Sequence, residues 1–142
     1  MNNKLVVYFS ATGHTKKVAT QLAKEQNASL YEIEPKDKYT SNDLDWLDTN
    51  SRSSLEMNNE SSRPEILNKL GSVSQYDTIF IGFPIWWYVE PRIIDTFLDA
   101  NDLSNKNIIL FATSGGSRID SAVNHLKTLY PQLHFHKAML LK

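Results

Sequence analysis

The segment VVYFSATGHT, from Val6 to Thr15, constrains the fold of this chain most strongly. An apolar run of about one strand's length meets a short loop of hydroxyl residues that contains one glycine. A helical pattern follows at once, because the apolar residues between positions 18 and 23 recur on one face of a helix. The segment therefore predicts a strand, a tight loop and a helix, in that order.

The loop at positions 10–15 has two interpretations. The first backbone N–H groups of a helix lack internal partners and carry partial positive charge, so they can hold a phosphate. Ser10, Thr12 and Thr15 would add hydroxyl donors, and Gly13 would let the backbone approach the ligand closely. No lysine or arginine precedes Lys16, so a phosphate would be held by neutral dipoles. The alternative is an ordinary helix cap, a position that Ser and Thr favour.

The order of residues in this loop resembles a known family. SATGHT after an N-terminal strand is similar to the (T/S)-x-T-G-x-T phosphate loop of flavodoxins, the small FMN-binding electron carriers. The resemblance implies that the phosphate of FMN is held by Ser10, Thr12, Gly13, His14 and Thr15.

Composition excludes several classes of protein. The 142 residues are 41% hydrophobic and 22% charged, which predicts one domain with a single core. We expect no membrane span and a cytoplasmic protein, because there is no long apolar run and no signal peptide. The absence of cysteine excludes disulfides, thiolate metal sites and a tyrosine-phosphatase nucleophile. A net charge of -1 argues against nucleic acid and gives only weak support for electrostatic docking to a basic redox partner.

Four further apolar runs alternate with helical patterns. They predict strands at 29–34, 78–83, 107–113 and 133–136, one helix with Pro91 in its first turn, and a second helix that ends near Pro131. This alternation predicts an α/β fold, a doubly wound flavodoxin-like domain over residues 1–142 with helices on both faces. We expect a five-stranded parallel sheet of order 2-1-3-4-5, with a ligand at the carboxyl ends of strands 1 and 3. The polar stretch 51–62 predicts a long loop, although its RSSLEM sequence resembles a segment of the short flavodoxins.

The end of the chain departs from this pattern. Only residues 137–142 follow the last predicted strand, too few for the closing helix of such a sheet. The final helix is therefore predicted to be missing or very short. Three explanations are open: the chain is truncated, its final element pairs with another molecule, or the remaining helix covers more of the sheet face. Our hypothesis is that a partner subunit, as in a homodimer, covers a patch near the carboxyl end.

The second informative stretch is GFPIWWYVEP, which starts at Gly82. Three adjacent aromatic residues after a strand could cap the core or form a wall on which a planar ring stacks. The stretch looks like the flavin loop of the short flavodoxins. This resemblance implies that the isoalloxazine ring of FMN contacts Pro84, Ile85, Trp86 and Trp87.

The third stretch, TSGGS, follows the predicted strand at 107–113. Its glycines and hydroxyls could serve a close backbone approach or simply a helix cap. In flavodoxins the matching loop lines the pyrimidine edge of the flavin, which implies a binding role for Thr113, Ser114, Gly115 and Gly116. His134 and His136 would share one face of a strand, but without further ligands we predict no metal site.

These features predict a protein that binds FMN non-covalently and transfers electrons between a reductase and an acceptor, both unidentified. One alternative is an FMN-dependent NAD(P)H oxidoreductase that acts on quinones or other small acceptors. A second alternative is a non-redox binding module with the same fold. The sequence contains no recognisable nucleophile, base and orienting residue, so no catalytic residue is predicted.

Overall fold

A computed structural model describes residues 3–68, 70–113 and 118–141. Within these ranges five parallel strands form one sheet in the order β2-β1-β3-β4-β5, which confirms the predicted topology. The strands are β1 (Lys4–Tyr8), β2 (Ser29–Glu32), β3 (Thr78–Pro84), β4 (Asn107–Thr113) and β5 (His134–Leu141). The described helices are α1 (His14–Gln26), α2 (Arg52–Met57), α3 (Arg92–Ala100) and α4 (Asp120–Leu129).

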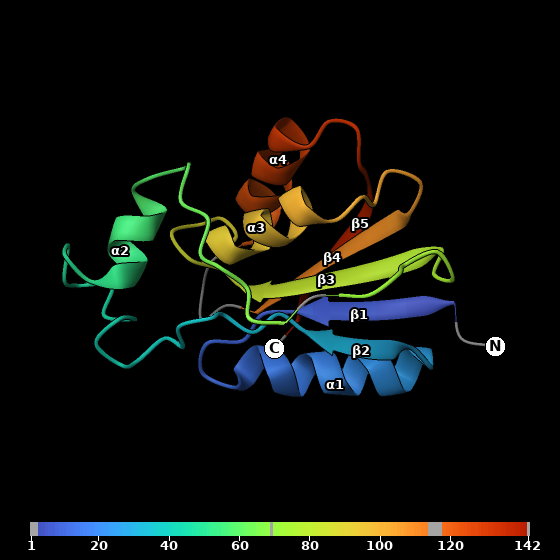
Figure 1. The fold of residues 1–142 in the computed structure, drawn as a ribbon, viewed down its shortest axis with the longest axis horizontal. Coiled ribbons are helices and arrows are strands. Elements are labelled where there is room, and N and C mark those ends of the chain that lie inside the picture. The colour runs from blue at the N-terminus through green and yellow to red at the C-terminus, as the bar shows by residue number, and fades with distance from the viewer. Residues whose placement is uncertain (1–2, 69, 114–117, 142) are drawn as a thin grey trace.

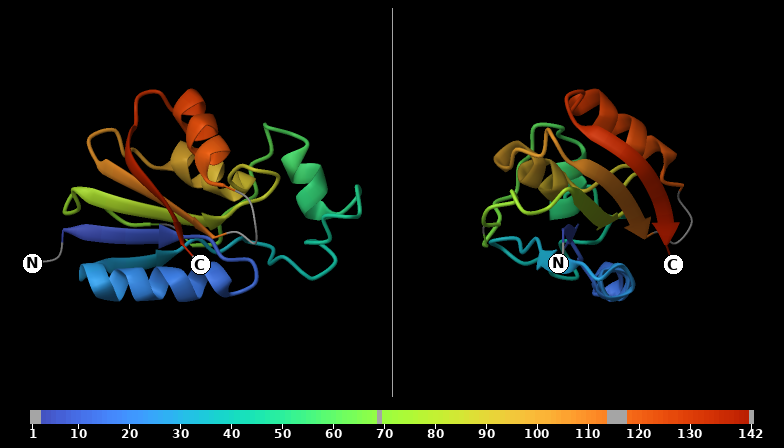
Figure 2. Two further views of the ribbon diagram at one scale, coloured as in Figure 1. Left: turned by 180° about the vertical axis from the view of Figure 1, so that it is seen from behind. Right: turned by 90° about the vertical axis from the view of Figure 1, so that its right-hand side faces the viewer.

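The helices are divided between the two faces of the sheet. Helix α1 covers one face, while α3 and α4 cover the other (Figures 1 and 2). Helix α2 lies apart from these layers, beyond the end of the sheet toward which the arrows of β1 and β3 point in Figure 1. The carboxyl ends of the strands therefore face α2, and this is the edge where ligands bind in sheets of this kind.

The central strands are apolar on both sides because both faces of the sheet are covered. On β1, Val6 packs in the core beneath α1 and Val7 in the core beneath α3 and α4, and both are fully buried. Tyr8 of β1 pairs with Gly82 of β3, and Gly82 pairs with Phe111 of β4. The three strands therefore end beside one another, which brings the loops that follow them together.

Strand β5 is longer than predicted. The predicted strand ends at 136, whereas the structure continues it to Leu141, which pairs with Thr113. The apolar residues near the end of the chain therefore extend the sheet instead of forming the remnant of a helix. Met139 and Leu141 pack partly buried against the core beneath α1. Whether a partner subunit covers part of this region stays a prediction.

Two local predictions are wrong. Residues 51–62 do not form one long loop, because α2 occupies the first half of this stretch. Ser51 caps that helix, and its side chain accepts a hydrogen bond from the backbone N–H of Ser54. Pro91 is the residue that precedes α3 and not part of its first turn. Its extended backbone, with φ −61° and ψ 148°, suits the N-cap position.

Candidate functional site

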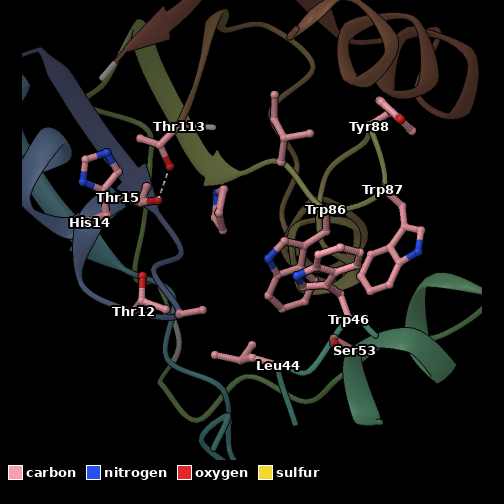
Figure 3. A pocket seen from close by; sticks show the side chains of 13 residues that line it. Thr12, His14, Thr15, Leu44, Trp46, Ser53, Trp86, Trp87, Tyr88 and Thr113 are labelled. Atoms are coloured by element: carbon pink, nitrogen blue, oxygen red, sulfur yellow. Dashed lines mark hydrogen bonds between the residues drawn. The ribbon is translucent and has the colours of Figure 1, made fainter. Parts of the chain in front are cut away.

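A pocket of about 680 Å³ opens at the carboxyl ends of the central strands (Figure 3). Its volume is in the range that is usual for small-molecule and cofactor sites, roughly 300–1,000 Å³. Its walls come from the loop after β1, the loop after β3, the end of β4, and the segment that contains α2. The lining residues are Ala11, Thr12, His14, Thr15, Leu44, Trp46, Ser53, Pro84, Ile85, Trp86, Trp87, Tyr88 and Thr113.

The loop after β1 forms the polar side of the pocket. Gly13 is the N-cap of α1, with φ 97°, and no side chain makes a capping hydrogen bond at this helix start. The hydroxyl of Ser10 accepts a hydrogen bond from the backbone N–H of Gly13 at 3.1 Å instead. The interpretation of this loop as a Ser or Thr helix cap is therefore wrong. With no acidic residue in the first turn of α1, this helix start suits an anion.

A buried hydroxyl pair joins the first turn of α1 to the end of β4. The Oγ1 atoms of Thr15 and Thr113 lie 2.7 Å apart, and either can be the donor. Both side chains are almost fully buried, so the contact fixes the start of α1 relative to the end of β4.

Trp86 is the central residue of the aromatic side. Its ring makes edge contacts with Phe9, at 5.8 Å between centroids, and with Tyr39, at 5.4 Å. The Tyr39 hydroxyl donates to Glu56 of α2, and the guanidinium of Arg52 lies 3.8 Å from the centre of the Tyr39 ring. Burial and the Glu56 carboxylate raise the pKa of Tyr39, so its hydroxyl remains a donor. Helix α2 thereby holds the indole of Trp86 in place.

The turn after Trp86 has an unusual backbone. Trp86 and Val89 exchange two backbone hydrogen bonds of 2.9 and 3.0 Å. The residues between them, Trp87 and Tyr88, have φ 49° and 71°. Two positive φ values between paired residues are typical of a type I′ turn, where Asn-Gly is the favoured sequence. Trp87 and Tyr88 are nevertheless 40% and 66% exposed, so this strained turn displays two aromatic side chains at the pocket.

A charged network lies behind this turn. His125 on α4 contacts the buried carboxylate of Glu90 from Nδ1 at 2.8 Å and the carboxylate of Glu60 from Nε2 at 2.7 Å. Chiefly through its hydrogen bond to Glu90, the pKa of His125 is raised to about 9. Burial raises the pKa of the neighbouring Asp95 carboxyl to about 9 as well. The network joins the end of the β3 loop to α4 and to the segment after α2.

The structure brings most of the predicted site residues to one pocket. Eight of them line it: Thr12, His14, Thr15, Pro84, Ile85, Trp86, Trp87 and Thr113. Ser10 and Gly13 shape the β1 loop without lining the pocket. Ser114, Gly115 and Gly116 lie outside the described residues. Whether any of these residues contacts a cofactor stays a prediction.

The third wall of the pocket was not predicted from the sequence. Leu44, Trp46 and Ser53 line it from the segment between β2 and β3. A lone tryptophan in the polar stretch 40–50 was the signal that could have drawn attention to this wall, because an isolated large aromatic needs a partner surface.

His134 and His136 belong to β5 at exposed positions. Across the described ranges, no group of three or more histidine, aspartate or glutamate side chains is placed to hold a metal ion. The described helices also include none with the length and apolarity to cross a membrane.

The comparisons with known proteins give the chain a family and solved structures that it resembles. The flavodoxin family model matches residues 3–142. A structure of a flavoprotein from Bacteroides uniformis is 51% identical over 99% of this chain and 90% of its own, with a TM-score of 0.96. A flavoprotein from Bacteroides eggerthii is 46% identical over 99% and 89% of the two chains, with a TM-score of 0.97. A Lactobacillus acidophilus flavoprotein, crystallised in complex with FMN, is 24% identical over 99% and 93%, with a TM-score of 0.82. No curated protein matches the chain. The chain belongs to the flavodoxin family.

Proposed function

We propose that this protein binds FMN non-covalently in the pocket and transfers electrons between redox partners. The observation that carries the proposal is the division of the pocket into two chemically different sides. Thr12, His14 and Thr15 lie on one side, at the start of α1, while Trp46, Trp86 and Trp87 lie on the other (Figure 3). FMN has the same two parts, a phosphate and a planar ring. Membership of the flavodoxin family and the FMN complex of the Lactobacillus acidophilus protein support the same cofactor.

The residues of each side suit the part of FMN that they would hold. The N-terminus of α1 and the hydroxyls of Thr12 and Thr15 would donate to the phosphate. The indoles of Trp86 and Trp87 would cover the ring and exclude water from it. A low-polarity wall disfavours negative charge on the ring and thereby lowers the potential at which it is fully reduced. When bound, FMN supplies the redox chemistry, and the protein supplies its position and surroundings.

A flavin titration tests the proposal. Purified protein is titrated with FMN and with riboflavin, which has the same ring without the phosphate. Thr12→Ala should weaken FMN binding about 10- to 100-fold, because a hydrogen bond to a charged group contributes roughly 1.5–3 kcal/mol. Riboflavin binding should not change. Ser121→Ala, an exposed hydroxyl on α4, is the matched control and should leave both affinities unchanged. Equal FMN affinities of the two variants would contradict the phosphate site.

Addition of NAD(P)H to the FMN-loaded protein separates the carrier from the enzyme. A carrier that needs an external reductase should keep its flavin absorption bands. Rapid bleaching would contradict the carrier and support an NAD(P)H oxidoreductase acting on small acceptors. Failure to take up any flavin would contradict both and support a non-redox binding module.

A further inference from the structure

Ser53 places an unused polar group on the third wall of the pocket. It lies in the first turn of α2, its side chain is only 2% exposed, and it lines the pocket. Its Oγ atom is buried and has no hydrogen-bond partner among the residues that the structure describes. A hydroxyl offers one donor and two acceptor sites, and leaving such a group unsatisfied in the interior is costly. Buried polar groups in folded proteins nearly always have partners, so this atom needs an explanation.

The neighbouring hydroxyls on the same helix are satisfied within the protein. Ser51 donates its hydroxyl to Ser54 Oγ at 3.0 Å, and Ser54 donates to the backbone carbonyl of Asp48 at 2.8 Å. Ser53 therefore differs from its two close serine neighbours: its hydroxyl has no partner among the described residues, and the residue lines the pocket.

The main chain around Ser53 is held at both ends of α2. The backbone N–H of Ser53 donates to the carbonyl of Asp43 at 2.9 Å. At the other end of α2, the nearly buried guanidinium of Arg92 donates to the carbonyl of Met57 at 2.8 Å. These contacts hold the main chain that carries Ser53 in place on the wall, as a binding group requires.

The position of Ser53 indicates which part of a ligand it meets. In Figure 3 Ser53 lies with Trp46 and Trp87, across the pocket from Thr12 and Thr15. We infer that Ser53 Oγ forms a hydrogen bond with a nitrogen or oxygen atom of the flavin ring, and that Ser53 is a binding residue for the ring and not for the phosphate. This inference rests on the proposed function.

The test compares FMN with riboflavin on Ser53→Ala. Because the two ligands share the ring, the variant should weaken both by the same factor, about 3- to 10-fold for one neutral hydrogen bond. Thr12→Ala should weaken FMN alone. Loss of FMN affinity without loss of riboflavin affinity in Ser53→Ala would overturn the assignment to the ring.

Thermal unfolding of the flavin-free protein supplies a second readout. Ser53→Ala should leave the melting temperature unchanged or raise it, since it removes a buried hydroxyl that has no partner in the described part of the chain. Ser54→Ala is the matched control and should lower the melting temperature, because its hydroxyl bonds to Asp48 and Ser51. A drop for Ser53→Ala as large as that for Ser54→Ala would overturn the inference in favour of a structural role.

The wild-type titration separates the two ways of failing. If the wild type binds FMN and Ser53→Ala binds it equally well, the role of Ser53 is refuted and the proposed function stands. If the wild type binds neither flavin, the proposed function is refuted and the inference with it. Should Ser53→Ala not fold, the nearly isosteric Ser53→Cys replaces it under the same criteria, because a thiol is a weak hydrogen-bond partner.

Discussion

The fold should lose stability as the pH rises from about 6.5 to about 9, because His125 holds its proton more tightly in the folded state. Its pKa rises from 6.5 to about 9 beside Glu90 and Glu60. The imidazolium can donate to both carboxylates, whereas neutral imidazole has a single N–H. Tighter proton binding by the folded state stabilises the protein fully below pH 6.5. This stabilisation is lost as the pH rises through the folded-state pKa near 9.

The size of the effect follows from the contacts of the imidazole. At about 1.36 kcal/mol for each pKa unit, the rise corresponds to at most roughly 3.4 kcal/mol. The side chain of His125 is 18% exposed and that of Glu90 is buried, but the side chain of Glu60 is 69% exposed, so solvent weakens that ion pair. We therefore expect a loss of about 1–2 kcal/mol across this pH range. Burial raises the pKa of Asp95 to about 9, so this carboxyl also makes the free energy of unfolding fall as the pH rises. The pH dependence of the wild type alone therefore does not identify the contribution of His125.

Urea unfolding at pH 6, 7.5 and 9 on the wild type and on His125→Gln isolates the contribution of the imidazole. The wild type should lose about 1–2 kcal/mol more than the variant between the first and last pH. His136→Gln, at an exposed position on β5, is the matched control and should keep the wild-type slope. If the wild type and His125→Gln lose stability equally, His125 does not bind its proton more tightly on folding, and the linkage argument is refuted.

Two further changes test the packing and the strained turn. Gly82→Ala should lower the free energy of unfolding in urea by about 1–3 kcal/mol, because its Cβ would lie 2.0 Å from the ring of the buried Phe111. Part of the loss should return in combination with Phe111→Leu, and wild-type stability of the single variant would contradict the close packing. Trp87→Asn combined with Tyr88→Gly should stabilise the flavin-free protein by about 1–2 kcal/mol for each relieved residue, because Asn-Gly suits this turn. The same double variant should bind FMN more weakly in a titration, and an unchanged affinity would remove both aromatics from the ligand site.

The order of the sheet was predictable because the strands are apolar runs, and helical patterns separate all of them except the second from the third. Helix α2 was not predictable from the sequence, since six residues are too few to form a stable helix on propensity alone. Its stability comes from contacts that are distant in sequence, such as Tyr39 with Glu56 and Arg92 with Met57. The same contacts hold the wall that carries Ser53, so this part of the site could not be predicted from the sequence either. The end of β5 was missed because a short apolar run is compatible with either a helix or a strand.

The hydroxyl pair of Thr15 and Thr113 has a consequence for how the start of α1 and the end of β4 respond to a ligand. One hydrogen lies between two oxygen atoms that are 2.7 Å apart, and either residue can supply it. If a ligand accepts a hydrogen bond from the Thr15 hydroxyl, the bond between the two threonines persists only with Thr113 as the donor. If a ligand accepts a hydrogen bond from the Thr113 hydroxyl, Thr15 must be the donor between the two threonines. A hydroxyl that donates to the ligand must therefore accept from the other hydroxyl, which leaves that other hydroxyl no hydrogen for the ligand. This coupling needs no movement of the backbone.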